Sequence, residues 1–175
     1  MDLYEAIETR RSVRSFADKV PPMELVEKII DKARLAPTWA NMQGAEYIIV
    51  RNPINVKKIY EAVDQGNKFR SAPMFIVGII SEKGSGKNFK SGLRYFMLDM
   101  GICFDHLILA ATAEGLASCW IGHFDEEKIK EILEIPKKYR VVCLTPLGYR
   151  TKEYEPRPRK NLEEIVHYEK YKGMM

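Results

Sequence analysis

The stretch LRYFMLDMGICFDHLILAATA, residues 93–113, is the longest apolar run in the chain. Its apolar residues fall on most faces of a helix, while Asp99, Asp105 and His106 interrupt it and argue against a membrane span. A helix this apolar needs cover on more than one side in a small domain. We therefore predict a core helix over residues 93–113, with part of its cover supplied by a second subunit.

On either side of this helix, short apolar strands alternate with amphipathic helices. Strands are predicted at residues 47–50, 74–80, 117–122 and 140–147, and helices at residues 2–9, 22–36, 53–63, 126–133 and 162–171. The run 74–80 suits a buried central strand. A length of 175 residues fits one domain with a substantial core. The pattern predicts a single α+β domain over residues 1–175, built around one sheet.

Composition narrows the partners. A net charge of +4 suits an anionic cofactor or substrate but falls short of the basic face of a nucleic-acid binder. Stacking aromatic residues among basic residues on a sheet, or a recognition helix, are also missing from the sequence. We therefore expect small-molecule partners, with no nucleic acid and no membrane.

Three cysteines, Cys103, Cys119 and Cys143, form no CxxC pair and lie in apolar stretches, so buried thiols are expected rather than disulfides or a zinc site. The three histidines show no metal spacing, and no metal site is predicted. The first residues include acidic side chains instead of a signal peptide, which favours the cytoplasm.

Two basic clusters stand near opposite ends of the chain. Arg10-Arg11-Ser12-Val13-Arg14 comes early, and Arg157-Pro158-Arg159-Lys160 comes late. Arginine offers a fixed fork of donors that matches a phosphate, and serine adds a hydroxyl. The two clusters could clamp one phosphate between the first and last elements of the domain. The alternative is two solvated basic stretches.

Three further segments occur between these clusters. They are APTWANMQ at residues 36–43, GLASCWIG at residues 115–122, and Leu147-Gly148-Tyr149. With the basic clusters, in this order and spacing, they resemble the FMN-dependent nitroreductase family in its short form. The family pattern is R-R-S-x-R, A-P-S-x-x-N-x-Q, G-L-G-S-C-W-I-G, L-G-Y and a late basic stretch. The resemblance covers almost the whole chain.

The resemblance implies a nitroreductase-like α+β fold, with a central, mostly antiparallel sheet flanked by helices, in an intertwined homodimer. Two flavin sites would lie at the subunit interface. It also implies which residues bind FMN. The phosphate would be bound by Arg10, Ser12, Arg157 and Arg159, and the pyrimidine edge would lie near Arg14, with Arg11 in support. The flavin of the other subunit would be reached by Pro37, Thr38, Trp39 and Asn41, and flavin N5 would lie beside Trp120, Ile121 and Gly122.

Parts of these segments depart from the family pattern or have ordinary explanations. Thr38 replaces the usual serine and keeps the hydroxyl, while Gly44 stands where proline commonly follows Gln43. Trp39 is bulkier than the residue often found there, and it could either stack near the ring or narrow the substrate opening. Pro37 is also an ordinary residue at a helix end, and Thr38 and Asn41 are ordinary loop residues, but neither explanation accounts for the indole of Trp39. Trp120 could simply be a buried tryptophan that ends a core strand.

The implied activity is that of an FMN-dependent oxidoreductase with a ping-pong cycle. A reduced donor, NADH or NADPH, would pass hydride to flavin N5 and leave, and a nitroaromatic or quinone would then take two electrons. The flavin carries the chemistry, so no side chain is predicted as catalytic acid or base. Two alternatives remain open: a flavin-binding or sensing module without turnover, and other chemistry such as reductive dehalogenation, enone reduction or flavin breakdown.

One glycine-rich segment resembles a phosphate-binding loop only superficially. In Gly84-Ser85-Gly86-Lys87, the expected first glycine position holds Ser81, and Asn88 stands where serine or threonine is required. We interpret residues 82–92 as a flexible loop between strand and helix, and as a candidate lid. His123 could line the mouth of the site.

Overall fold

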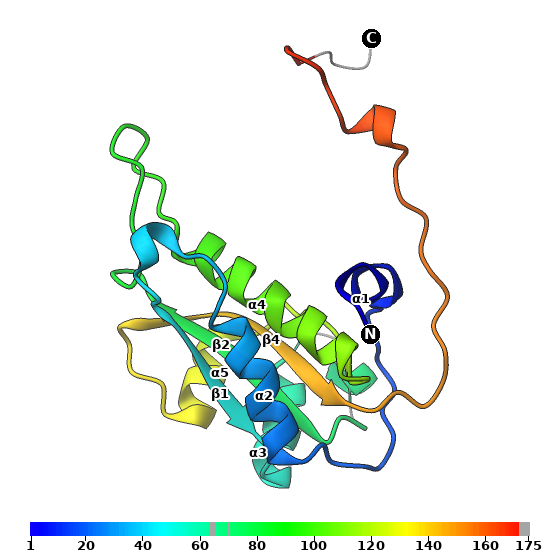
Figure 1. Cartoon of the computed structure of the whole chain (residues 1–175). Coiled ribbons are helices and arrows are strands. Elements are labelled where there is room, and N and C mark those ends of the chain that lie inside the picture. Colours follow the sequence, from blue (N-terminus) through cyan, green and yellow to red (C-terminus); the bar gives the residue numbers. More distant parts are fainter. Residues whose placement is uncertain (64–65, 70, 172–175) are drawn as a thin grey trace.

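The computed structural model describes residues 1–63, 66–69 and 71–171, arranged around one sheet (Figure 1). The helices are α1 (Leu3–Thr9), α2 (Met23–Ala33), α3 (Pro53–Ala62), α4 (Phe96–Ala113) and α5 (Glu126–Leu133), and the strands are β1 (Ala45–Val50), β2 (Met74–Ser81), β3 (Ala117–Ser118) and β4 (Tyr139–Gly148). Short 3-10 turns are η1 (Trp39–Asn41), η2 (Gly66–Phe69) and η3 (Leu162–Glu164). The strand order is β1-β2-β4-β3, and every pairing is antiparallel. The predicted α+β fold is confirmed.

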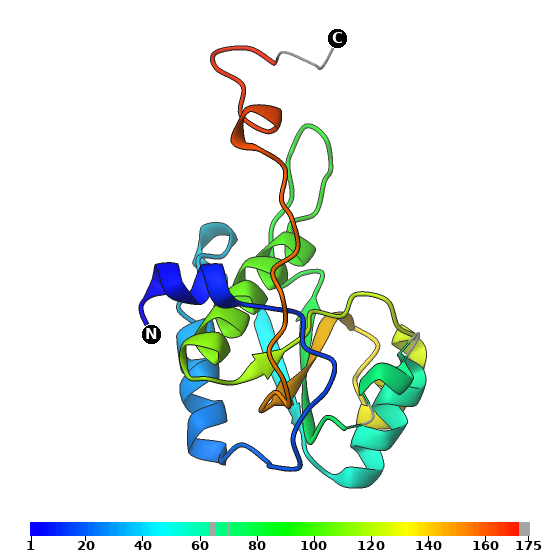
Figure 2. The ribbon, with the colours of Figure 1, turned by 90° about the vertical axis from the view of Figure 1, so that its right-hand side faces the viewer.

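The sheet is covered on both faces. Helices α2 and α4 lie on one side and α3 and α5 on the other (Figure 2). Side chains alternate along the central strand β2, so that Phe75 and Val77 join the core under α3 and α5, whereas Met74 and Ile76 join the core under α2 and α4. This double burial explains why β2 reads as a continuous apolar run.

Helix α4 is the core helix that the sequence predicts. Met100, Phe104 and Leu107 are buried against the sheet, while Met97 and Leu98 are exposed. Gly78 of β2 permits the close approach, because a Cβ there would lie 2.7 Å from the Met100 sulfur. Length and composition alone would also allow α4 to span a membrane. Its packing against the sheet and α2 is that of a core helix with one apolar face left uncovered by its own chain.

Three predicted boundaries are wrong. Helix α2 ends at Ala33 rather than at residue 36. Helix α4 begins at Phe96 rather than at residue 93, because Gly92 has a φ of +72° and Leu93 accepts a hydrogen bond from Asn88 within the preceding loop. The strand expected at residues 117–122 ends at Ser118. The chain leaves the sheet and pairs with β4 again only at Ile121, through a single bridge to Leu144.

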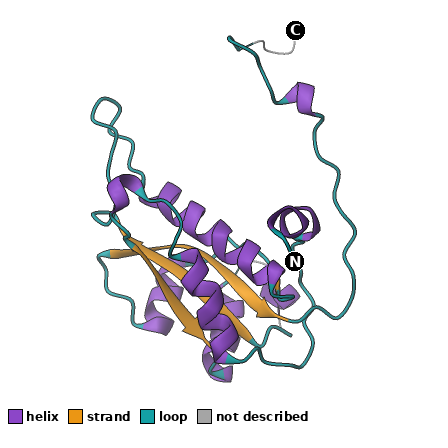
Figure 3. Cartoon of the chain, in the orientation of Figure 1, coloured by secondary structure: helices purple, strands orange, loops and turns teal. Residues whose placement is uncertain are grey.

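The predicted helix at residues 162–171 is also wrong. Only η3 forms there, and residues 152–171 run as an extended segment, the C-terminal arm, away from the body of the molecule (Figures 1 and 3). Its apolar side chains are exposed: Leu162, Ile165, Val166, Tyr168 and Tyr171. An isolated ten-residue helix is marginal without a surface to pack on. The sequence has the apolar spacing of a helix, but no surface formed by the described residues packs against these side chains.

Candidate functional site

Backbone pairing brings the two ends of the chain together. The segment around residues 12–17 runs alongside residues 149–154, where the Ala17 N–H donates to the Tyr149 carbonyl over 2.8 Å. The Tyr154 hydroxyl accepts from the backbone N–H groups of Arg14 and Ser15, at 3.3 and 3.1 Å. These bonds hold the early basic cluster beside the start of the arm that carries the late one.

The two basic clusters line one cavity of about 410 Å³, the cationic cavity. Its walls are Ile7, Glu8, Arg10, Arg11, Ser12, Arg14, Glu155, Pro156, Arg157 and Arg159. Five arginines thus face two glutamates. Within the described part of the chain none of the five arginines forms a salt bridge. The cavity therefore carries positive charge that the protein itself leaves largely uncompensated.

The arginines of the cationic cavity keep donors free for a ligand. Arg11 donates from Nη1 to the carbonyls of Glu8 and Arg10, at 2.6 and 2.9 Å, but its buried Nε has no hydrogen-bond partner among the described residues. Arg159 Nη1 donates to the Arg157 carbonyl over 3.2 Å, which ties its guanidinium to the arm. Several guanidinium forks and the Ser12 hydroxyl form a donor set that fits the dianionic phosphate of FMN.

A second cavity of about 300 Å³, the Trp120 cavity, adjoins the first at Arg14. Its walls are Arg14, Val63, Lys68, Phe69, Cys119, Trp120, Ile121, Gly122 and His123. The Val13 N–H donates to the Ser118 carbonyl over 2.9 Å, which fixes the early basic cluster against the edge of the sheet. Arg14 thus links a cavity suited to a phosphate with one lined by apolar and aromatic groups.

Local geometry leaves room at the wall formed by residues 120–122. Trp120 packs edge-on against Phe104, with ring centroids 5.1 Å apart, and stays 41% exposed. A Cβ added at Gly122 would meet nothing closer than the Trp120 indole nitrogen at 3.9 Å, so its absence opens space toward the cavity. The Ile121 N–H is already used by the Leu144 carbonyl, at 2.9 Å. The N–H groups of Trp120 and Gly122 donate to no group of the described residues, which leaves them for a ligand.

Cys119 lies at the same wall but is not a nucleophile. Burial raises the pKa of its thiol, although Arg14, Ser12 and Arg10 act in the opposite direction. The thiol is therefore protonated at neutral pH and is a poor nucleophile. Because Arg14 lines both cavities, the positive charge of the cationic cavity extends to the Trp120 cavity.

The third predicted group, Pro37, Thr38, Trp39 and Asn41, lines neither cavity of its own chain. It belongs to the loop at residues 36–44, beside the N-terminal end of α4, whereas α1, which contributes Ile7 and Glu8 to the cationic cavity, lies toward the other end of α4 (Figure 1). Thr38 Oγ1 accepts from the Gln43 N–H over 3.0 Å, and Asn41 has a φ of +56°. Within one chain, the structure therefore does not bring this group together with the other predicted site residues.

Several contacts of the site carried no signal in the sequence. Tyr154 bonds residues about 140 positions earlier, and Phe69 enters the Trp120 cavity from η2. Asp99 bonds the Trp39 backbone from 60 residues away. An acidic residue within an otherwise apolar helix was the only available hint for Asp99. His123 does line the Trp120 cavity, as expected. Across residues 1–63, 66–69 and 71–171, no group of three or more His, Cys, Asp or Glu residues could hold a metal ion.

Comparisons with known proteins point to one family. The nitroreductase family model matches residues 7–79 and 64–149. A protein of Archaeoglobus fulgidus whose name includes NADH dehydrogenase/NAD(P)H nitroreductase is 33% identical over 177 residues, covering 97% of this chain and 99% of the relative. Iodotyrosine deiodinase 1 of Sus scrofa is 23% identical over 195 residues, covering 94% of this chain and 68% of the relative.

Solved structures show the same fold. A nitroreductase family protein of Clostridium difficile 630 superposes with a TM-score of 0.90 at 29% identity, covering 98% of this chain and 100% of that one. An FMN-dependent nitroreductase of Clostridium difficile R20291 has a TM-score of 0.84 at 25% identity, with coverage of 96% and 99%. This chain belongs to the nitroreductase family, and the predictions of a nitroreductase-like fold and of an oxidoreductase enzyme are confirmed.

Proposed function

We propose that this protein binds FMN with its phosphate in the cationic cavity and its ring toward the Trp120 cavity. It would pass two electrons from NADH or NADPH to a small electrophilic acceptor such as a nitroaromatic or quinone. One observation carries the proposal: five arginines that form no salt bridge with any described residue surround a cavity, and this cavity adjoins an aromatic cavity at Arg14. A phosphate attached to a flat ring system matches both halves.

The residues divide the work of binding. Arg10, Arg157 and Arg159, with the Ser12 hydroxyl, neutralise the phosphate, and each charged hydrogen bond contributes about 1.5–3 kcal/mol. Arg14 extends the positive charge to the ring, where it favours an anionic state. The free N–H groups of Trp120 and Gly122 are candidate donors to the ring edge, and the open space at Gly122 lets the ring approach. When bound, FMN supplies the two-electron chemistry itself.

The names of relatives support NADH or NADPH as the electron donor. They leave two kinds of acceptor to test, a nitroaromatic and a halogenated compound. The Archaeoglobus relative is named for NAD(P)H and nitro compounds, which favours a nicotinamide donor and a nitroaromatic acceptor. The deiodinase relative supports reductive dehalogenation as a second candidate activity of the same site. Both would use one flavin face in turn, first for the donor and then for the acceptor.

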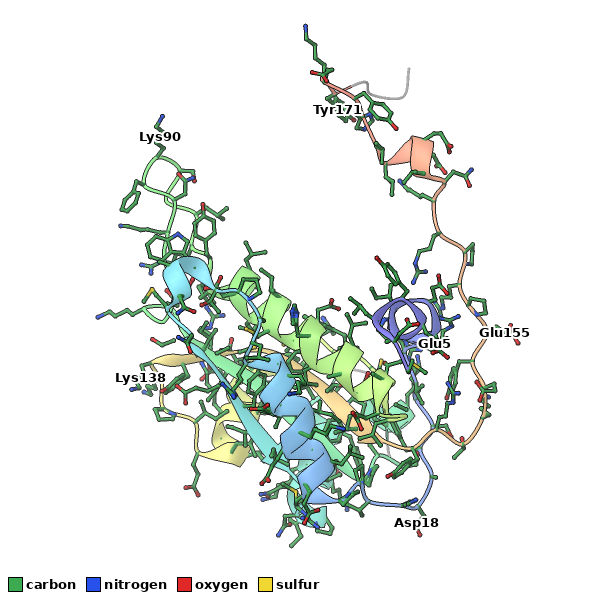
Figure 4. The ribbon with its side chains drawn as sticks, in the orientation of Figure 1. Glu5, Asp18, Lys90, Lys138, Glu155 and Tyr171 are labelled. Atoms are coloured by element: carbon green, nitrogen blue, oxygen red, sulfur yellow. The ribbon has the colours of Figure 1, made fainter. Side chains whose placement is uncertain are left out.

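We also propose that two copies form an intertwined homodimer with flavin at the interface. The C-terminal arm carries five exposed apolar side chains away from its own body, as the positions of Glu155 and Tyr171 show in Figure 4. Helices α1 and α4 leave Leu3, Ile7, Met97 and Leu98 exposed. A second copy would cover both surfaces, and obligate interfaces of this kind bury about 2,000–5,000 Å² in total.

The enzyme proposal is tested anaerobically. Purified protein reconstituted with FMN should bleach on addition of NADH or NADPH and recover its colour on addition of a nitroaromatic. Recovery with a halogenated phenol instead, accompanied by halide release, would favour dehalogenation. A protein that takes up FMN but is not reduced by either nicotinamide would be a binding or sensing module. Failure to take up FMN would refute the binding proposal itself.

The dimer proposal has a separate test by mixing subunits. If each flavin uses Arg10 of one subunit and Asn41 of the other, a mixed dimer of Arg10→Ala and Asn41→Ala chains has one intact site and one doubly altered site. Refolding the two variants together should therefore restore about half of the wild-type flavin content to the mixed species. Mixing that restores nothing, or a monomer that holds FMN fully by light scattering, would refute the shared site.

A further inference from the structure

Asp99 joins three segments of the chain from inside the fold. It lies in the first turn of α4 and is only 3% exposed. Both carboxylate oxygens accept the Trp39 N–H, each over 3.1 Å, and Oδ2 also accepts the Ser85 hydroxyl over 2.6 Å. The buried charge therefore ties the 36–44 loop and the 82–95 loop to the same helix end, where the helix dipole also favours a negative charge.

Glycines let these two loops touch. A Cβ at Gly86 would lie 2.2 Å from the Trp39 indole, and a Cβ at Gly44 would lie 2.1 Å from the Gly84 carbonyl oxygen. Neither contact would tolerate a side chain without a shift of the backbone or the ring. Gly44, at the position where the family commonly has proline, and the glycines of the Gly84–Lys87 segment thus serve the packing of one loop on the other.

The 82–95 loop is itself braced. The Tyr95 N–H donates to the Gly86 carbonyl over 3.0 Å, and Asn88 and Leu93 are joined by a 2.8 Å backbone bond. Its tip, marked by Lys90 in Figure 4, projects beyond the body while its base packs on Trp39. Trp39 is therefore seated on one side against Gly86, yet it remains 37% exposed.

We propose that Asp99 is a positioning residue that locks Trp39 in place, and that Trp39 acts as a fixed wall which limits the size of the acceptor admitted to the flavin. The proposal rests on the function proposed above, in which the 36–44 loop reaches the flavin of the partner subunit. Of the two roles open to Trp39 from sequence, narrowing the opening fits the seat on Gly86 better than stacking freely on the ring.

The substitution Asp99→Asn tests the lock with little change in volume. Both oxygens lie 3.1 Å from the same N–H, so an asparagine amide in either orientation keeps one oxygen acceptor for the Trp39 N–H, replaces the other with an NH₂ donor that opposes it, and removes the negative charge. Ser85 can rotate its hydroxyl to suit, but the backbone N–H cannot. The variant should therefore loosen Trp39 specifically. Asp105→Asn, at an exposed position on the same helix, is the matched control.

The first readout needs no flavin. The chain has two tryptophans, so Trp120→Phe leaves Trp39 as the sole reporter. In flavin-free protein of that background, Asp99→Asn should at least double the acrylamide quenching constant of Trp39, while Asp105→Asn leaves it unchanged. Circular dichroism checks that both variants are folded. Equal quenching in the two variants would refute the lock, whatever the protein does with FMN.

The second readout is acceptor size, in otherwise wild-type chains reconstituted with FMN. The ratio of kcat/KM for a two-ring naphthoquinone to that for a one-ring benzoquinone should rise roughly tenfold in Asp99→Asn, because a loosened wall admits the larger ring. Gly86→Ala, which displaces the indole without touching the carboxylate, should change the same ratio. If Trp39 loosens and the ratio stays constant, the proposal that Trp39 limits the size of the acceptor is refuted. If the wild type binds no FMN, the proposed function fails while the quenching result still decides the lock.

Discussion

The cationic cavity and the Asp99 lock handle charge in opposite ways. The cavity gathers five arginines with no salt bridge among the described residues, whereas Asp99 is a single buried carboxylate whose oxygens all accept hydrogen bonds. Unpaired like charges repel one another and gain from an added anion, while a satisfied buried charge gains nothing from one. The difference supports the proposals that the first region binds a ligand and that the second holds a loop in place.

The two regions also differ in how they are assembled. The cavity depends on backbone bonds between distant ends of the chain, reinforced by the Tyr154 hydroxyl. The lock depends on side-chain bonds and on close approach at glycines. Changes that remove cavity charge should therefore act mainly on flavin affinity, and changes near the lock should act mainly on loop geometry and stability.

The largest effect expected is that of the ligand itself. FMN should stabilise the apoprotein against urea by about 2.7 kcal/mol when its free concentration is one hundred times Kd, because only the folded state has the cavity. Inorganic phosphate should give a smaller stabilisation with the same sign. Urea unfolding curves at increasing FMN provide the measurement. A urea-unfolding midpoint that does not change with FMN concentration would contradict the proposal that the cationic cavity, unlike the Asp99 lock, binds a ligand.

Removing one arginine of the cationic cavity should cost nearly as much. Arg10→Ala or Arg159→Ala deletes a charged donor to the phosphate, worth about 1.5–3 kcal/mol, or roughly 10- to 150-fold in Kd. Arg51→Ala is the control, since Arg51 is exposed and lines neither cavity. Titration of apoprotein with FMN, followed by flavin fluorescence, gives the three affinities. Equal Kd values for the three variants would show that both basic clusters are solvated surface charge with no role in FMN binding.

Tyr154→Phe should have an intermediate effect. The change removes the acceptor for the Arg14 and Ser15 N–H groups and leaves both donors short of a partner, at a cost of about 1–3 kcal/mol of stability. FMN affinity should fall as well, but less than in the arginine variants, because the positive charges remain. Tyr139→Phe loses a hydroxyl bond to Glu46 at 2.7 Å, away from both cavities, and should leave affinity unchanged.

The sequence predicted the cationic cavity better than the lock. Both basic clusters and the segment around Trp120 appear as short motifs with a readable donor chemistry, and the fold brings them to adjoining cavities. Their roles toward FMN stay predictions. The Asp99 contacts join residues 14 and 60 positions apart through geometry that no local pattern encodes. From the sequence, Gly44 is only a departure from the family pattern and Gly86 only a loop residue, because the groups that they contact in the fold are distant in sequence.

The fold shows the same division between local and long-range information. The core helix and the buried strand β2 followed from periodicity, since their own residues decide their burial. The helix predicted over residues 162–171 failed because apolar spacing specifies a helix only where a surface receives it. The described part of the chain offers the C-terminal arm no such surface, and the proposed dimer rests on the same observation.

A cluster of ion pairs anchors the base of the 82–95 loop and offers the last comparison. Glu126 accepts from Arg140 and the Val141 N–H, and Arg140 also lies 3.4 Å from Glu82, where the loop begins. Burial acts to raise the pKa of Glu126, but the hydrogen bonds from Arg140, Lys130 and Val141 outweigh it and bring the pKa down to about 2.

The smallest effect on flavin binding is therefore expected from Glu126→Gln, whose effect should appear in stability instead. A carboxyl with a pKa of about 2 in the folded state and 4.5 in the unfolded state contributes stability that is fully present above pH 4.5 and is lost as the pH falls toward 2. Glutamine has no such titration, so the wild type should be more stable than the variant at pH 7, and the two should converge between pH 4.5 and 2. Urea unfolding across this range measures the convergence, and FMN titration at pH 7 should give matching affinities. A stability difference that persists undiminished at pH 2 would show that Glu126 stabilises the fold through its shape rather than its charge. A loss of FMN affinity at pH 7 would show that the base of the 82–95 loop and the cationic cavity are not independent.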